Sequence, residues 1–142
     1  MTRSQFRMAL VVAATVLLAG ACGDTKTPVI PSNPTNPIEP TTVTFEDTLT
    51  VNGAKSFGFG TLNGTVTATL TSLGPDSTVA VGLSLGTWSG TVCNVILAND
   101  NAVQGTTIVG QSGTIGTLCV RIYDAAGTLT EPLPFVLTVV HP

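Results

Sequence analysis

Residue types that could catalyse a reaction are few in this chain, and their spacing makes no active site. His141, the sole histidine, stands one residue from the end, where a chain is usually too mobile to hold a catalytic base or a metal ligand. No Gly-x-Ser-x-Gly sequence marks a serine nucleophile. Glu46 and Asp47 adjoin, but neighbours on a strand point to opposite faces and form no acid–base pair. The alternative is a catalytic acid–base pair formed by two acids that are distant in sequence, and the sequence leaves this alternative open. We therefore expect no catalytic residue, no cofactor and no enzymatic activity.

Two pairs of residues are candidates for ligand contact without catalysis. Asp100, in the sequence Asn99-Asp100-Asn101 that we expect to be a loop, and Asp124 are weak calcium candidates, because a hard cation needs about six oxygens. Turn formation explains the same residues, so we assign no metal. Trp88 and Tyr123 are candidates for stacking on a sugar, although a single tryptophan in a β-sandwich also serves as core or edge cover.

The first 21 residues have the pattern of a secretory signal peptide. Arg3 and Arg7 precede an apolar run over residues 8–18, and small side chains at 19–21 suit cleavage. A helix that spans a bilayer needs about 20 apolar residues, so this run is too short to be one. We predict a signal peptide over 1–21.

Cys22 follows the signal peptide, and the ending Leu-Leu-Ala-Gly-Ala-Cys resembles a bacterial lipoprotein signal, with Ala19 where the commoner motif has leucine. The resemblance implies that Cys22 is lipidated and becomes the first mature residue; the alternative is ordinary cleavage after Ala21. A diacylglycerol with an amide-linked chain would anchor the protein stably, since one acyl chain alone is marginal. Gly23, rather than an acid, comes next, which favours the outer over the inner membrane under enteric-type sorting. We expect an envelope lipoprotein whose domain lies in the periplasm or at the cell surface.

Residues 22–42 are predicted to be a tether. Prolines recur there every three residues, which is the period of a polyproline II helix. At about 3.1 Å per residue, the proline segment would span about 37 Å. The residues between are too polar and too few to form a core. The alternative is a recognition peptide for an aromatic-lined groove. The prolines are Pro28, Pro31, Pro34, Pro37 and Pro40.

Charge and composition exclude two classes of protein. Without the signal peptide, Lys26, Lys55 and Arg121 oppose all eight acids, which leaves a net charge of −5. A phosphate-binding surface needs clustered cations, so we expect no nucleic-acid partner. Hydrophobic residues make up 43% of the chain and charged residues 9%, which excludes disorder for the bulk of the chain.

From residue 43 onward the apolar residues alternate with polar ones, and turn residues separate the runs. This pattern predicts a single antiparallel β-sandwich of about eight strands, jelly-roll-like, over 43–142. Asn52-Gly53 is a hairpin signal, and Gly74–Ser77 is expected to turn. Because few Lys or Glu residues guard the edges, the edges must be short, bulged or covered. The predicted runs are 43–51, 55–59, 65–70, 79–85, 92–97, 106–109, 118–123 and 135–140.

Cys93 and Cys119 are the remaining cysteines, and each lies in a predicted strand. Export permits oxidation, and with Cys22 assigned to lipid the other two can pair. Closing a loop of about 26 residues stabilises a fold by about 3.5 kcal/mol in the chain-entropy model. Two free buried thiols are the alternative. A metal site is disfavoured because no histidine lies nearby.

Four segments resemble bacterial pre-peptidase C-terminal (PPC-type) domains, in the right order. Ser56–Phe59 and Val66–Leu70 resemble the paired strands that open such domains, Gly116–Tyr123 the penultimate strand and Phe135–Val139 the closing strand. The resemblance implies a jelly-roll-like sandwich that serves as an accessory module on secreted proteins. Val79–Leu83 lacks the acids that the family often has in its middle strand, so no calcium or acidic surface is carried over.

The immunoglobulin class is the rival fold, but it needs a tryptophan between two cysteines that are further apart, and Trp88 precedes Cys93. The sequence favours a non-catalytic lipoprotein that displays an interaction module at a membrane surface, with an unknown protein or glycan ligand. A carbohydrate-binding module that uses Trp88 is the competing hypothesis.

Overall fold

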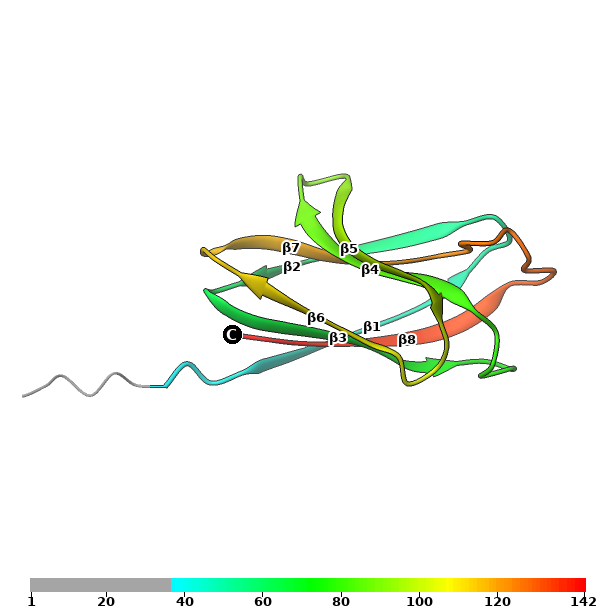
Figure 1. Ribbon diagram of the computed structural model, residues 1–142, viewed down its shortest axis with the longest axis horizontal. Coiled ribbons are helices and arrows are strands. Elements are labelled where there is room, and N and C mark those ends of the chain that lie inside the picture. Colours follow the sequence, from blue (N-terminus) through cyan, green and yellow to red (C-terminus); the bar gives the residue numbers. More distant parts are fainter. Residues whose placement is uncertain (1–36) are drawn as a thin grey trace, which may run out of the picture. The chain divides into compact units, whose positions relative to one another are not determined.

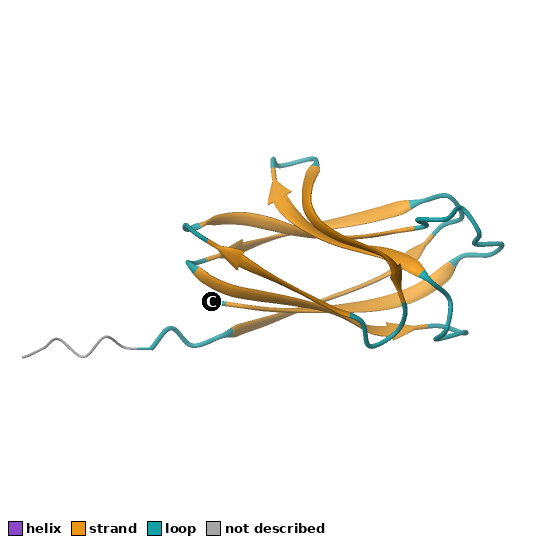
Figure 2. Cartoon of the chain, viewed as in Figure 1, coloured by secondary structure: helices purple, strands orange, loops and turns teal. Residues whose placement is uncertain are grey.

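Alternation of apolar and polar side chains produces eight strands in the computed structural model, which describes residues 37–142. In β3, for example, Val66, Ala68 and Leu70 are fully buried while the threonines between them are not. The described part of the chain contains strands and loops without a helix (Figure 2), so the predicted all-β class is confirmed. The strands are β1 (Thr41–Leu49), β2 (Ala54–Thr61), β3 (Gly64–Leu73), β4 (Val81–Trp88), β5 (Cys93–Ala102), β6 (Thr107–Ser112), β7 (Gly116–Tyr123) and β8 (Leu133–His141).

The strands form two antiparallel four-stranded sheets that stack face to face (Figure 1). One sheet has the order β1-β8-β3-β6 and the other β2-β7-β4-β5. Only β4 and β5 are both consecutive in sequence and paired, because every other connection crosses from one sheet to the other. This is the strand order of a jelly roll, and it confirms the predicted sandwich.

The core lies between the sheets and is built from the inward-facing residues of both. Leu137 of the central strand β8 is typical: it is fully buried and pairs with Phe45 on one side and Leu70 on the other. The buried core residues are Leu49, Phe59, Val66, Ala68, Leu70, Leu73, Val81, Leu83, Leu85, Ala102, Val120, Ile122, Leu129, Leu133, Phe135, Leu137 and Val139.

Aromatic side chains close one side of the sandwich, where the edge strands β1 and β2 face each other. The rings of Phe45 and Phe57 stack with centroids 4.8 Å apart, and Phe57 meets the edge of Phe135 at 6.1 Å. Each such aromatic pair stabilises the fold by about 0.5–1.5 kcal/mol, in addition to the stabilisation that comes from burying the apolar area of the rings. This side of the sandwich is therefore sealed.

The predicted hairpin at Asn52-Gly53 is wrong, although the predicted turn forms. Asn52 has a φ of 52°, and the Gly53 amide donates to the Thr50 carbonyl at 2.9 Å. The strands on either side do not pair, since β1 pairs with β8 and β2 with β7. The turn instead connects β1 of one sheet to β2 of the other sheet. The turn at Gly74–Ser77 also forms, with the Asp76 carboxylate accepting from the amide of Thr78 at 2.8 Å.

Two further expectations are wrong, one about a loop and one about the end of the chain. Asn99–Asn101 lies within β5 rather than in a loop, because an exposed edge strand tolerates polar residues. His141 ends β8 and is only 7% exposed, with its ring centroid 5.2 Å from that of Phe59. Pairing of His141 with Thr41 in the sheet holds this terminal residue in place.

The segments with targeting features lie outside the described residues. These are the predicted signal peptide, Cys22 and the tether as far as residue 36. In residues 37–142 there is no helix with the length and hydropathy needed to cross a membrane.

Truncation of the central strand tests this core. We expect Leu137→Ala to lower the free energy of unfolding by about 2–5 kcal/mol, because it leaves a cavity between the sheets. Val140→Ala is the matched control, since Val140 lies on the same strand and is 36% exposed; its cost should stay below about 1 kcal/mol. Urea denaturation measures both. Equal losses in the two variants would contradict the assignment of the core.

Candidate functional site

The β4–β5 hairpin bends sharply at Gly86. A side chain at this position would collide with the backbone carbonyl of Asn94, so the close approach of the two strands requires glycine. Opposite this point β5 carries one extra residue, because Leu85 pairs with Leu97 and Gly86 with Val95, which leaves Ile96 in a bulge. A bulge bends a strand and increases its twist. The tip of the hairpin consequently projects from the outer face of its sheet (Figure 1).

A disulfide ties the projecting hairpin to β7. Cys93 begins β5 and bonds to Cys119, with Cα atoms 5.7 Å apart, so the predicted pairing forms. Trp88, at the end of β4, is half-buried, and its indole lies close against Gly58 of β2. A Cβ at Gly58 would lie 2.9 Å from two indole atoms. Trp88 therefore acts as cover beside the disulfide.

Tyr123 lies further along the same face and has other partners. Its ring covers Gly82, its hydroxyl donates to the Asp100 carboxylate, and the Arg121 guanidinium carbon lies 4.9 Å from the ring centroid. Burial, helped by the hydrogen bond to Asp100, raises the pKa of the Tyr123 hydroxyl.

Trp88 and Tyr123 do not form a shared platform. Tyr123 pairs with Gly82, and Cys119, beside the tryptophan, pairs with Gly86. Four residues along a strand cover about 14 Å. The structure therefore places the two candidate sugar contacts at opposite ends of the outer face.

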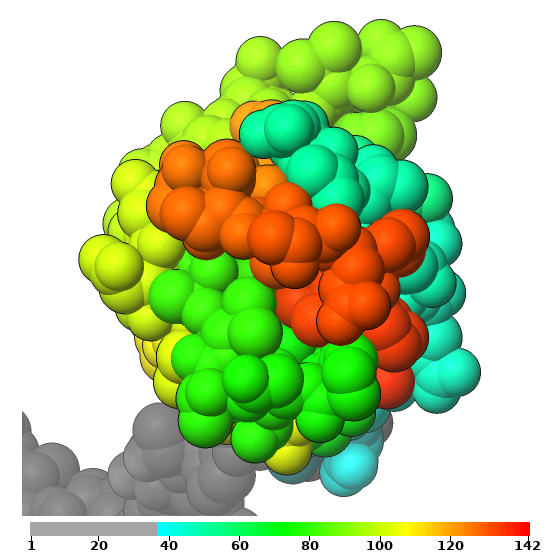
Figure 3. Space-filling view, turned by 90° about the vertical axis from the view of Figure 1, so that its right-hand side faces the viewer, coloured from blue at the N-terminus to red at the C-terminus, as the bar shows by residue number. Residues whose placement is uncertain are grey.

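The second calcium candidate, Asp124, organises loops. Its carboxylate accepts hydrogen bonds from the amides of Asn52 at 3.0 Å, Thr128 at 3.1 Å and Leu129 at 3.3 Å. These bonds join the β1–β2 turn to the β7–β8 loop, which lies across one end of the sandwich (Figure 3). Within residues 37–142 no group of three or more His, Cys, Asp or Glu side chains is placed to hold a metal ion.

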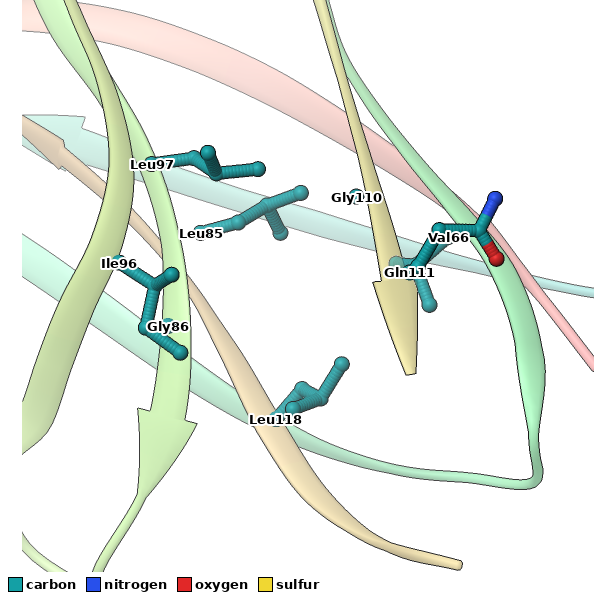
Figure 4. Close-up of a pocket in the computed structure, with 8 residues that line it drawn as sticks. All are labelled: Val66, Leu85, Gly86, Ile96, Leu97, Gly110, Gln111 and Leu118. Carbon is teal, nitrogen blue, oxygen red and sulfur yellow. The ribbon is translucent and has the colours of Figure 1, made fainter. Parts of the chain in front are cut away.

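An apolar groove opens on the side of the sandwich opposite the phenylalanine stack, between the edge strands β5 and β6 (Figure 4). Leu85, Ile96 and Leu97 form one wall, Val66 and Gln111 the other, and Leu118 lies at one end. Gly110 contributes no side chain, and a Cβ there would reach ordinary contact with Leu97 at 3.4 Å. The groove is thus a gap in the core that the bulge and a glycine leave open.

The groove suits a side chain of a partner better than a free small molecule. Its volume is about 50 Å³, whereas pockets for small ligands measure about 300–1,000 Å³. Two of the apolar side chains that line it reach solvent, since Ile96 is 68% exposed and Leu97 is 39% exposed. Along both walls the edge strands present backbone groups on the side away from their own sheets.

The sequence alone did not indicate this groove, because its residues have the types and spacing of ordinary core residues. The available signal was Gly86 and Gly110, two glycines in strand interiors, where glycine often marks a bulge or a close approach.

Comparisons with known proteins bear on the fold alone. No protein-family model matches the sequence, and no curated protein matches it. Among solved structures, the chain is similar to PliG of Aeromonas hydrophila, a periplasmic lysozyme inhibitor of g-type lysozyme. The TM-score is 0.51 at 14% sequence identity, and the match covers 70% of this chain and 86% of that one.

The disulfide should contribute strongly to stability because it closes a long loop. We expect the double variant Cys93→Ser, Cys119→Ser to lose about 3.5 kcal/mol of unfolding free energy. A reductant should destabilise the wild type by a similar amount and leave the double variant unchanged, as measured by urea denaturation. Equal sensitivity of the wild type and the double variant to reductant would contradict the assignment of the Cys93–Cys119 disulfide.

Proposed function

We propose that this protein is a non-catalytic cell-envelope lipoprotein whose sandwich binds an extended segment of a partner protein. The apolar groove between the edges of β5 and β6 is the observation that carries the proposal. An extended peptide laid along a sheet edge gains backbone hydrogen bonds, and alternate side chains enter a groove beside it. The residues around the groove supply both the edges and the apolar walls.

The partner segment should be apolar at alternate positions and positively charged overall. Residues 37–142 carry two cations, Lys55 and Arg121, and seven acids, a net charge of −5. Charge of one sign attracts partners of the other sign and speeds their encounter. A basic segment is therefore favoured over an acidic one.

A protein ligand is favoured over a glycan because of where the aromatic side chains lie. A two-ring sugar platform needs rings that lie side by side, whereas Trp88 packs on Gly58 at one end of the outer face and Tyr123 on Gly82 at the other. A glycan module remains the alternative, and Trp88, the only tryptophan in the chain, reports on it. A saturable change in its fluorescence with a polysaccharide would favour the glycan.

The proposal also includes a lipid anchor at Cys22 and a relationship to PPC-type domains. The signal-like segment ending at Cys22 supports lipidation, and the tether would hold the domain away from the membrane surface, with the outer membrane favoured. The jelly-roll strand order is consistent with the PPC-type resemblance.

Inhibition of a lysozyme is a second candidate function. The similar fold of the periplasmic inhibitor supports an envelope location and a protein partner, and the acidic domain would suit a basic enzyme. The direct test is the rate of a g-type lysozyme on cell walls with and without the chain. An unchanged rate would remove this candidate and leave the groove proposal intact.

A peptide selection tests the groove. From a displayed library of ten-residue peptides, residues 37–142 should enrich basic sequences with alternating apolar residues. Gly110→Val should weaken the enriched peptides at least about tenfold, because its side chain fills the space in which a partner side chain would lie, near Leu97. Fluorescence anisotropy measures the affinities.

The matched control is Gly60→Val, because Gly60 lies in β2 with open space where a Cβ would be. It should leave peptide affinity unchanged. Failure to enrich any peptide, or peptides that bind the Gly110→Val variant as tightly as the wild type, would overturn the groove as the binding site.

Intact mass tests the anchor separately. The chain extracted from bacterial membranes should begin at Cys22 and carry a diacylglyceryl group and an amide-linked acyl chain. The Cys22→Ser variant should lack this added mass and leave the membrane fraction. A mature chain that begins elsewhere, or an unmodified Cys22, would contradict lipidation.

A further inference from the structure

A second hollow lies on the outer face of the β2-β7-β4-β5 sheet, away from the groove. Its floor contains Arg121 of β7 and, on β2, Ser56 and Ala54. Its wall is the projecting hairpin, through residues 91–93. The hollow is open to solvent and has a volume of about 270 Å³, just below the range of small-ligand pockets.

Sheet register places a hydroxyl on each side of Arg121. Ser56 pairs with it from β2 and Ser84 from β4. Ser84 is fully buried, and its Oγ has no hydrogen-bond partner among residues 37–142. Thr91 lines the hollow on the hairpin side. Arg121, a half-buried residue, therefore has three hydroxyl-bearing residues as neighbours.

Arg121 has no carboxylate partner in the described part of the chain, although seven acids lie there. The ion pair of residues 37–142 joins Lys55 to Asp47 at 2.8 Å. The ring of Tyr123 supports the guanidinium at 4.9 Å but supplies no acceptor oxygen. The fork of arginine N–H groups matches the two oxygens of a carboxylate.

We infer that the hollow at Arg121 binds a carboxylate group. The guanidinium takes both carboxylate oxygens, the hydroxyls of Ser56 and Thr91 donate to them, and Val92 contacts the short aliphatic stem behind the carboxylate. The disulfide holds the hairpin wall in place, because Cys93 lines the hollow and Cys119 lies two residues before Arg121. The site is independent of the groove and of its proposed partner.

Titration with small carboxylates tests the site. The probes are acetate, for a free acid, and N-acetyl-glutamate-methylamide, for an acidic side chain of a polypeptide. Their neutral counterparts are acetamide and the glutamine analogue. The full chain in detergent micelles is titrated at constant ionic strength, and the NMR signals of Arg121 Nε–H and the amides of 91–93 are followed.

Both carboxylates should shift these signals saturably, and the neutral probes should not. Tighter binding of the glutamate probe than of acetate would identify an acidic polypeptide as the source.

Two variants and one control decide whether Arg121 carries the binding. Arg121→Gln should abolish saturable binding, and Arg121→Lys should weaken it about tenfold because the fork is lost while the charge stays. Lys55→Gln removes the other cation of residues 37–142 and should leave binding unchanged. Dispersed amide spectra confirm that each variant folds, and if Arg121→Gln does not fold, the lysine variant decides. Non-saturable shifts, equal shifts with the neutral probes, or binding retained in the folded arginine variants would overturn the site.

Discussion

The contact that shapes this molecule is the close approach of two backbones at Gly86. Because the carbonyl of Asn94 leaves no room there for a Cβ, β5 can cross β4 tightly, and the extra residue Ile96 bends it away. Three consequences follow from this bend. The hairpin tip rises from the sheet so that Cys93 reaches Cys119, a hollow forms between the hairpin and Arg121, and the edge of β5 no longer covers the core.

The two sides of the sandwich, where edge strands of the two sheets face each other, differ in how well side chains fill the gap. Where β1 faces β2, the stacked rings of Phe45 and Phe57 fill the gap between the sheets. Where β5 faces β6, Gly110 offers no side chain and Leu97 is left 39% exposed. An exposed edge beside an exposed core is a liability for aggregation unless a partner covers it. Function in this chain is therefore inferred from an unfilled surface rather than from reactive residues.

Much of the fold could be predicted from the sequence, and the failures have physical causes. Side chains in a strand alternate between two faces, so periodicity located eight strands, but it does not identify which strands pair. Asn52-Gly53 indicated a turn, yet a turn geometry does not specify the sheet that receives the next strand. His141 is buried through pairing with Thr41, which is distant in sequence. The groove and the hollow depend on the bulge at Ile96. A glycine inside a strand, such as Gly86, can mark a bulge, but it does not identify which residue of the partner strand is the extra one.

The claim that the backbones require glycine at position 86 is tested most directly by the free energy of unfolding of Gly86→Ala, measured in urea beside Gly60→Ala. Alanine in place of a strand glycine ordinarily costs nothing and often stabilises. At Gly60 the space is open, and the change should stay within about 0.5 kcal/mol. At Gly86 we expect a loss of at least about 2 kcal/mol, since the Asn94 backbone must move. Equal stability of the two variants would contradict this claim.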